Sequence, residues 1–225
     1  MTKVETVMPG VQAIQLTRVF AHLVDANPVN LIDTGYAGST PAIERALSRL
    51  GRRLEDVARV VCTHGHPDHA GSARALADRG IEVFIHPADA ERMRTRWGSV
   101  VRHPSRGRLF GAMTPPLERF TPLADGDVLP MLGGLRVVHT PGHTPGSVCL
   151  YGARDRVLFV GDALQRPSGK IGFASSVYSD DRRAAERAVK RLAELDVEVV
   201  VFSHYPPIHE GANEALRELA GRVRD

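Results

Sequence analysis

The most constraining feature of this sequence is residues 63–69, Thr-His-Gly-His-Pro-Asp-His, which carry the pattern His-x-His-x-Asp-His. Imidazole and carboxylate groups are ligands of divalent transition metals such as zinc. The motif follows the apolar run 57–62 and precedes a helical pattern. In an extended segment His64 and His66 point the same way, while the turn into the helix directs Asp68 and His69 towards a neighbouring point. The motif therefore predicts two adjacent metal sites.

Three further ligand-type residues lie just beyond apolar strand patterns. His143 follows the run 135–139, Asp162 follows 156–160 and His204 follows 197–202. Each alone is more typical of a turn residue. Open α/β sheets, however, place ligands at the carboxyl ends of their strands. Four strand ends that each carry a His or Asp indicate one shared site.

The rest of the chain alternates strand and helix patterns within a single predicted domain, residues 1–225. Thr40 is predicted as the N-cap of a helix with an apolar stripe at Ile43, Ala46, Leu47 and Leu50. Residues 98–118, rich in Gly, Pro and Arg, are predicted to be irregular. The Pro- and Gly-rich stretches 104–116 and 165–172 are long enough to form a lid or a pocket wall. We expect strands at 11–16, 18–24, 29–33, 57–62, 81–85, 135–139, 148–151, 157–160 and 197–202, and helices at 41–50, 70–78, 88–96, 181–195 and 213–223.

Composition excludes several classes of protein. Apolar residues make up 43% of the 225, which is enough for a packed core. Two cysteines do not make a disulfide scaffold, and no apolar run reaches the length of a membrane span. A net charge of +3 is too small to indicate nucleic-acid binding. The N-terminal residues show no signal-peptide pattern, so we expect a cytoplasmic protein with no nucleic-acid or membrane partner.

The seven ligand-type residues, in this order and together with Leu-Ile-Asp-Thr-Gly at 31–35, resemble the metallo-β-lactamase fold superfamily. The resemblance implies an α/β fold, an αββα sandwich of two mixed β-sheets flanked by helices. It also implies that one metal ion is bound by His64, His66 and His143, and a second by Asp68, His69 and His204, with Asp162 bridging the two.

The same resemblance implies a hydrolase with two divalent metal ions. Zinc is the first choice, with manganese or iron as alternatives. Two such ions about 3.5–4 Å apart can share a water, lower its pKa and present a bridging hydroxide to a carbonyl. Asp68 and Asp162 are the candidate catalytic carboxylates, and Asp68 could orient the hydroxide or carry a proton. The two ions outweigh the charges of both carboxylates and the hydroxide, which favours a small anionic substrate.

Five residues are candidates for substrate binding. His22 falls where relatives have an aromatic residue near the site mouth, and Lys170 partly matches a Gly-Cys-Gly-Lys/Arg element of hydroxyacylglutathione hydrolases. Tyr205 follows the last ligand, where the family usually has glycine. Arg94 and Arg102 belong to a stretch, 92–117, with six arginines and no acidic residue, which is typical of a solvated face or of a rim that attracts an anion.

Departures of this chain from the patterns of individual subfamilies narrow the range of activities that we expect. β-Lactamases of this fold generally lack the bridging Asp, and lactonases carry a Tyr where this chain has Gln165. The leading interpretation is a dinuclear hydrolase of a small ester, thioester or lactone. The alternatives are a persulfide dioxygenase-like oxidoreductase with a single iron at His64, His143 and Asp162, and a non-catalytic metal-binding protein. Substrate, physiological metal and oligomeric state stay open.

Overall fold

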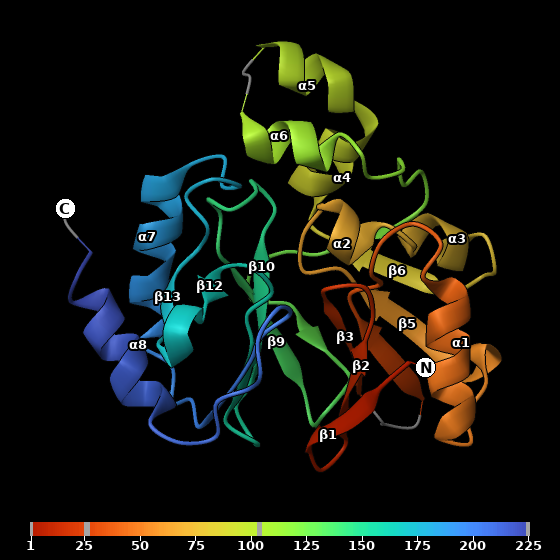
Figure 1. The fold of residues 1–225 in the computed structure, drawn as a ribbon, viewed down its shortest axis with the longest axis horizontal. Helices are drawn as coiled ribbons and strands as arrows, with labels where there is room; N and C mark the ends of the chain where they lie inside the picture. Colours follow the sequence, from red (N-terminus) through yellow and green to blue (C-terminus); the bar gives the residue numbers. More distant parts are fainter. Residues whose placement is uncertain (1, 25–27, 103–104, 224–225) are drawn as a thin grey trace.

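The computed structural model describes residues 2–24, 28–102 and 105–223, and its centre is a pair of β-sheets packed face to face (Figure 1). The first sheet runs in strand order β1-β2-β3-β4-β5-β6-β7 and the second in the order β14-β11-β10-β9-β8. Strands β4 to β7 are parallel and β1 to β4 antiparallel, while β14 lies parallel to β11 in an otherwise antiparallel sheet. The strands of the first sheet are β1 (Val4–Met8), β2 (Val11–Gln15), β3 (Phe20–Val24), β4 (Val29–Ile32), β5 (Val57–Val61), β6 (Glu82–Ile85) and β7 (Thr121–Pro122). Those of the second are β8 (Val128–Leu129), β9 (Leu135–His139), β10 (Val148–Gly152), β11 (Val157–Phe159) and β14 (Val199–Val201).

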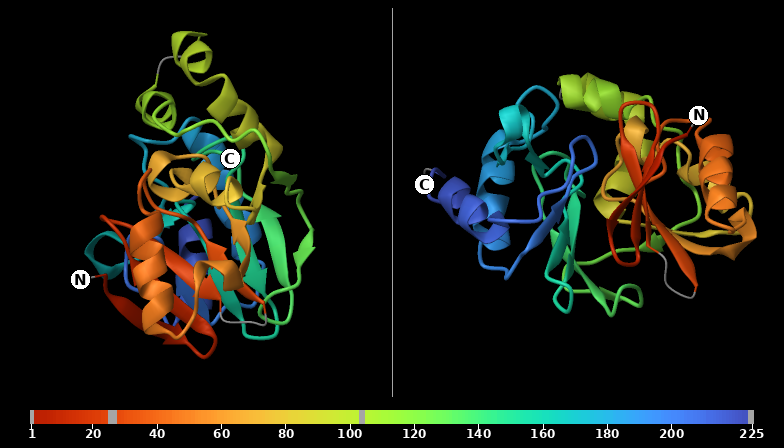
Figure 2. Two further views of the ribbon diagram at one scale, coloured as in Figure 1. Left: turned by 90° about the vertical axis from the view of Figure 1, so that its right-hand side faces the viewer. Right: turned by 60° about the horizontal axis from the view of Figure 1, so that its bottom comes forward.

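Helices cover the outer face of each sheet, so the layers are αββα, as the two views of Figure 2 show. Helices α1 and α3 pack on the first sheet, and α7 and α8 on the second. A small hairpin of β12 (Leu164–Gln165) and β13 (Gly172–Phe173) joins the second half. The predicted fold class is thereby confirmed. The helices are α1 (Thr40–Arg49), α2 (Pro67–Ala70), α3 (Ala73–Ala77), α4 (Pro87–Arg94), α5 (Arg96–Arg102), α6 (Arg106–Gly111), α7 (Arg182–Leu192) and α8 (Ala212–Ala220), with short 3-10 turns at Leu54–Asp56 and Pro167–Gly169.

Three apolar cores separate the four layers, because successive residues of a strand face opposite sides of its sheet. On β4, Leu31 packs towards α1 while Ile32 packs between the sheets. On β10, Leu150 lies between the sheets while the neighbouring Cys149 faces α7 and α8. Both cysteines, Cys62 and Cys149, are buried and free.

Several element boundaries differ from the sequence-based prediction. Helix α1 starts at Thr40 with Ser39 as N-cap, so Thr40 lies inside the helix, and Leu50 is exposed rather than part of the buried stripe. The predicted helix 70–78 begins earlier, with Pro67 in its first turn, and divides into α2 and α3. A Cβ at Gly71, between them, would meet the backbone of Tyr36 at 2.6 Å, so only glycine fits where the helical segment passes that loop.

The stretch predicted to be irregular contains two helices, α5 and α6. They stand away from the sandwich, above α4 and the upper edge of the sheets (Figures 1 and 2). Ser105 caps α6, because its hydroxyl accepts a hydrogen bond from the Arg108 amide. Within the described residues no helix is both long and apolar enough to cross a bilayer.

Candidate metal centre

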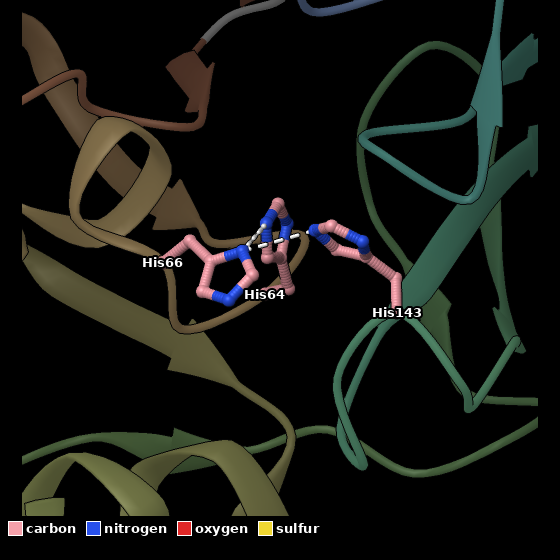
Figure 3. Close-up of side chains that lie close together, drawn as sticks. All are labelled: His64, His66 and His143. Carbon is pink, nitrogen blue, oxygen red and sulfur yellow. Dashed lines mark hydrogen bonds between the residues drawn. The ribbon is translucent and has the colours of Figure 1, made fainter. Parts of the chain in front are cut away.

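The first group of ligand-type atoms joins the two sheets. His64 and His66 lie in the loop after β5, and His143 lies in the loop between β9 and β10 of the opposite sheet (Figure 3). His66 Nδ1 is 3.2 Å from His64 Nε2 and 2.9 Å from His143 Nε2. These separations are close to the ~3.3 Å expected between ligand atoms of a tetrahedral zinc site with bonds of about 2.0–2.1 Å. All three side chains are buried.

The second group is built the same way. Asp68 and His69 come from α2 of the first half, and His204 follows β14 in the second. His204 Nε2 lies 3.3 Å from both His69 Nε2 and Asp68 Oδ2, and the last two atoms are 3.6 Å apart. Asp68 and His69 are buried and His204 is partly exposed, so this group lies nearer to solvent.

The carboxylate of Asp162 faces both groups. Its Oδ2 is 3.5 Å from His143 Nε2 in the first group. Its Oδ1 is 3.5 Å from His69 Nε2 and 3.2 Å from His204 Nε2 in the second. Asp162 follows β11. The preceding Gly161 has a positive φ and lies so close to Thr63 that an added Cβ would be 2.7 Å from the Thr63 hydroxyl oxygen. The structure thus brings all seven predicted ligand residues together.

The far nitrogens of the imidazoles show which atoms are free to bind metal. His69 Nδ1 donates to Asp33 Oδ2 and His204 Nδ1 donates to the Arg18 carbonyl, both at 2.8 Å. His66 Nε2 donates to the Gly107 carbonyl at 3.2 Å. Because these acceptors carry no hydrogen, each neutral ring keeps a lone pair on its inward nitrogen, the form that metals bind. Inward lone pairs about 3 Å apart repel one another unless cations or protons lie between them.

The remaining contacts also suit metal ions. Thr63 Oγ1 donates to Asp33 and can then accept from His64 Nδ1, 3.1 Å away. Asp68 Oδ1 is buried without a hydrogen-bond partner among the described residues. A buried, unpartnered carboxylate oxygen is costly unless a cation is near. The donor set, five imidazoles and two carboxylates, therefore fits two divalent ions.

The pKa shifts show how strongly these groups interact in the metal-free chain. Burial opposes charge on Asp162, but the neighbouring His69 and His204 outweigh it and hold its pKa far below the usual range. Burial also opposes charge on His69 and His204, yet the carboxylates raise their pKa to about 9 and about 11. Burial lowers the pKa of His64. Without metal, the protonated rings of His69 and His204 balance the negative charge of the carboxylates. Bound cations would supply that positive charge instead.

A buried aspartate that the sequence analysis did not single out braces both ligand loops. Asp89, on α4, is fully buried, and its carboxylate accepts from the Gly65 amide at 2.7 Å and the Gly146 amide at 2.8 Å. The Thr144 hydroxyl donates to the same carboxylate at 2.6 Å. The contact fixes the loop of His64 and His66 against the loop of His143. No local pattern marks Asp89, since its partners are 24 to 57 residues away.

A second brace is the buried pair Arg92 and Asp180. Arg92 Nη2 donates to the Gly107 carbonyl at 2.8 Å and lies 3.3 Å from Asp180 Oδ1. The Asp180 amide donates to the His143 carbonyl at 3.1 Å, and the Gly107 carbonyl also accepts from His66. The pair therefore supports ligand residues from both sheets.

The predicted substrate-binding residues are scattered. His22 is buried against Phe159, and burial lowers its pKa to about 4. Tyr205 lines a cavity of about 90 Å³ that also includes His22. Lys170 is exposed and lines a separate cavity of about 270 Å³ beside α8. Arg94 is exposed beside Glu91, and the side chain of Arg102 lies outside the described residues.

Three aromatic residues near the metal ligands did not emerge from the sequence. The Phe110 ring of α6 lies 5.4 Å from the His66 ring and 5.5 Å from the Tyr178 ring. Tyr36, in the loop after β4, is half-buried, and its pKa is raised by burial and by the charges of Asp68 and Asp162. Isolated aromatic residues in loops give no periodic signal, so only the fold reveals their position.

The comparison with known families agrees with this geometry. The sequence profile of the metallo-beta-lactamase superfamily matches residues 16–204, and the chain belongs to that superfamily.

The individual relatives share only part of their sequence with this chain. Over 172 residues the chain is 36% identical to the acyl-coenzyme A thioesterase MBLAC2 of Homo sapiens, a match that covers 67% of this chain and 58% of the relative. It is 26% identical over 166 residues to the hydroxyacylglutathione hydrolase GloC of Haemophilus influenzae, covering 71% and 74% of the two chains. Among solved structures, the metallo-beta-lactamase family protein TTHA1429 from Thermus thermophilus is similar with a TM-score of 0.75 and 28% identity, over 96% of this chain and 80% of that one.

Proposed function

We propose that the chain is a dinuclear metal-dependent hydrolase that cleaves a small anionic ester, thioester or lactone. The observation that carries the proposal is the carboxylate of Asp162, which has one oxygen towards each group of histidines. A carboxylate in that position suits two ions rather than one. The names of two relatives, a thioesterase and a hydroxyacylglutathione hydrolase, support the thioester among the three substrate classes.

Two divalent ions, when bound, polarise the scissile carbonyl and activate a water molecule as the nucleophile near neutral pH. The chain's own residues then orient the reacting groups and transfer protons. Asp68 lies beside His69 and His204 through its Oδ2, so its carboxylate can orient the attacking water or accept its proton. Asp33 keeps the His69 ring in one orientation through its Nδ1 hydrogen bond. The Phe110 ring lies 5.4 Å from the His66 ring and contacts the Tyr178 ring, which gives the centre an apolar neighbour on the side of His66.

The test combines metal content with a substrate panel. Protein produced without added metal is analysed for bound metals and assayed on esters, thioesters, lactones and phosphodiesters. We expect two zinc or manganese ions per chain and hydrolysis of the first three classes. One iron ion per chain with oxygen consumption would replace the proposal with the oxidoreductase alternative, and metal binding without turnover would favour the non-catalytic one.

A matched pair of variants sharpens the result. Asp162→Ala should abolish hydrolysis, whereas Asp78→Ala should leave it unchanged, because the Asp78 carboxylate is exposed and pairs only with surface arginines among the described residues. Equal activity of both variants would show that the hydrolysis does not depend on this centre.

A further inference from the structure

The most unusual surface of the molecule lies over α5 and α6. Eight large apolar side chains are exposed among the described residues, and six of them fall within 97–113 and 177–178. The two stretches are neighbours in space, since a Cβ at Gly107 would meet the Tyr178 carbonyl. A water-soluble protein rarely gathers exposed apolar side chains in one place unless something binds there. We call the exposed side chains of Trp97, Val101, Leu109, Met113, Val177 and Tyr178, together with the exposed Arg94 and Arg106, the apical surface.

The apical side chains come from α5, from α6 and from the turn after α6. Trp97 and Val101 are four residues apart within α5, so they project from one side of that helix, while Leu109 lies on α6 and Met113 in the turn that follows it. Their exposed fractions are 57%, 81%, 52% and 63%. The opposite side of α6 faces the metal centre, through Phe110 and the Gly107 carbonyl. The outward apolar side chains are thus not required to hold α6 on the fold.

The charge around these side chains is basic. Residues 92–117 contain six arginines and no acidic residue. Arg106 is exposed and, within the described part of the chain, forms no ion pair, while the exposed Arg94 pairs only with the equally exposed Glu91 at 3.6 Å. Such exposed pairs are weak and leave the cation available. Trp97 adds an amphipathic ring of the kind enriched where protein meets the boundary of a bilayer.

We propose that the apical surface docks on an anionic lipid bilayer, with the apolar side chains entering the interface and the arginines contacting headgroup phosphates. A second copy of the chain fits less well, because a twofold contact would bring the same arginines against each other. Docking of this kind requires no membrane-spanning helix. It departs from the expectation that the protein has no membrane partner, which rested on the lack of an apolar span. The proposed docking does not depend on which substrate the metal centre cleaves.

The sole tryptophan of the chain provides the probe. The protein is mixed with vesicles of phosphatidylcholine and phosphatidylglycerol in equal parts, or of phosphatidylcholine alone, and then sedimented. We expect co-sedimentation and a blue shift of Trp97 emission with the anionic vesicles only, both reduced by added salt. A chain that stays in the supernatant with anionic vesicles overturns the proposal.

Variants locate the contact. Val101→Ser combined with Leu109→Ser should weaken vesicle binding by about tenfold or more, the order expected for losing the burial of two apolar side chains. Arg106→Glu should weaken it by about fivefold or more, because one basic residue near an anionic surface contributes about that factor. Val128→Ser is the matched control: Val128 is 66% exposed but lies on β8, outside the apical surface.

Two results would contradict the assignment. If Val128→Ser weakens vesicle binding as much as the double variant, the contact does not lie on the apical surface. If sedimentation velocity shows a dimer that the double variant converts to monomer, while no vesicle binding occurs, the surface pairs with a second copy instead.

Discussion

Arg92 and Asp180 form a buried ion pair between α4 and the loop before α7, with Nη2 3.3 Å from Oδ1, although they are 88 residues apart in the chain. Through this pair the segments that support His66 and His143 share one electrostatic contact. Removal of Arg92 leaves the buried Asp180 carboxylate with only the Ser105 hydroxyl, 3.4 Å away, and Arg108, 3.7 Å away, as side-chain partners among the described residues. Its charge is then only partly compensated, which is a costly change for a buried group.

Arg92→Met is therefore expected to lower the free energy of unfolding by about 3 kcal/mol. Urea denaturation of the metal-free protein measures the loss. Arg94→Met is the matched control for stability, because its side chain is exposed two residues away, and it should change the unfolding free energy by less than about 0.5 kcal/mol. Equal effects of the two variants would mean that the buried pair contributes nothing beyond a surface contact.

Asp33→Asn should weaken metal binding without unfolding the chain. Asp33 Oδ2 accepts from His69 Nδ1, and an amide at this position can turn its NH₂ group towards the ring and disturb its orientation. Loss of such a supporting carboxylate typically costs about 10–100-fold in metal affinity. Competition with a chromogenic chelator measures the affinity, and Asp56→Asn, on the surface, is the control. Unchanged affinity would mean that Asp33 does not hold the His69 ring.

His22 predicts a pH dependence of stability. Burial lowers its pKa from 6.5 to about 4, so the unfolded chain binds the proton more readily between these values. The stabilising effect of the neutral form is complete above pH 6.5 and is lost as the pH falls towards 4. At pH 5 the loss amounts to about 2 kcal/mol relative to pH 7.5. His22→Leu, which keeps an apolar contact with Phe159, should remove that part of the pH dependence in urea titrations.

The control for this experiment is His209→Leu, since His209 is exposed. If His22→Leu and the unchanged chain lose stability in parallel between pH 7.5 and 5, His22 is not the group responsible.

Gly107→Ala tests the close contact between α6 and the loop of Tyr178. An added Cβ would lie 2.1 Å from the Tyr178 carbonyl oxygen, so α6 or the loop must move. We expect a loss of about 1–3 kcal/mol in unfolding free energy, the range for overpacked sites, together with weaker metal binding because the Gly107 carbonyl contacts His66. Gly221→Ala is the control, because its nearest neighbours would be at an ordinary 3.5 Å. A neutral Gly107→Ala variant would show that the contact relaxes freely.

The residues that cluster at the candidate metal centre could be identified from the sequence because their signal is local and chemical. His64 to His69 form one short motif, and His143, Asp162 and His204 each follow a readable strand. The sandwich followed from the resemblance that these residues carry. Substrate contacts could not be predicted, since they depend on which loop side chains turn inwards. His22 is an example: a strand position near the site proved to point into the core.

The helices α5 and α6 were missed for a different reason. Glycine and proline at Gly98, Pro104, Gly107 and Gly111 are typical of irregular segments, and the apolar residues there follow no stripe that a core would bury. Helix α6 is stabilised instead by the local Ser105 cap and by tertiary contacts such as that of the Phe110 ring with His66. Asp89 escaped notice, and Arg92 was recognised only as one of six nearby arginines, because a buried charge on a short helix looks like an ordinary surface residue in sequence.

Each group of metal ligands takes members from both sheets, His64 and His66 with His143, and Asp68 and His69 with His204. An ion bound there would therefore hold the first and second halves of the chain together. During synthesis the first group is complete only after His143 has left the ribosome, and the second only after His204. The centre can therefore be completed only after both halves of the chain have been synthesised and have folded against each other.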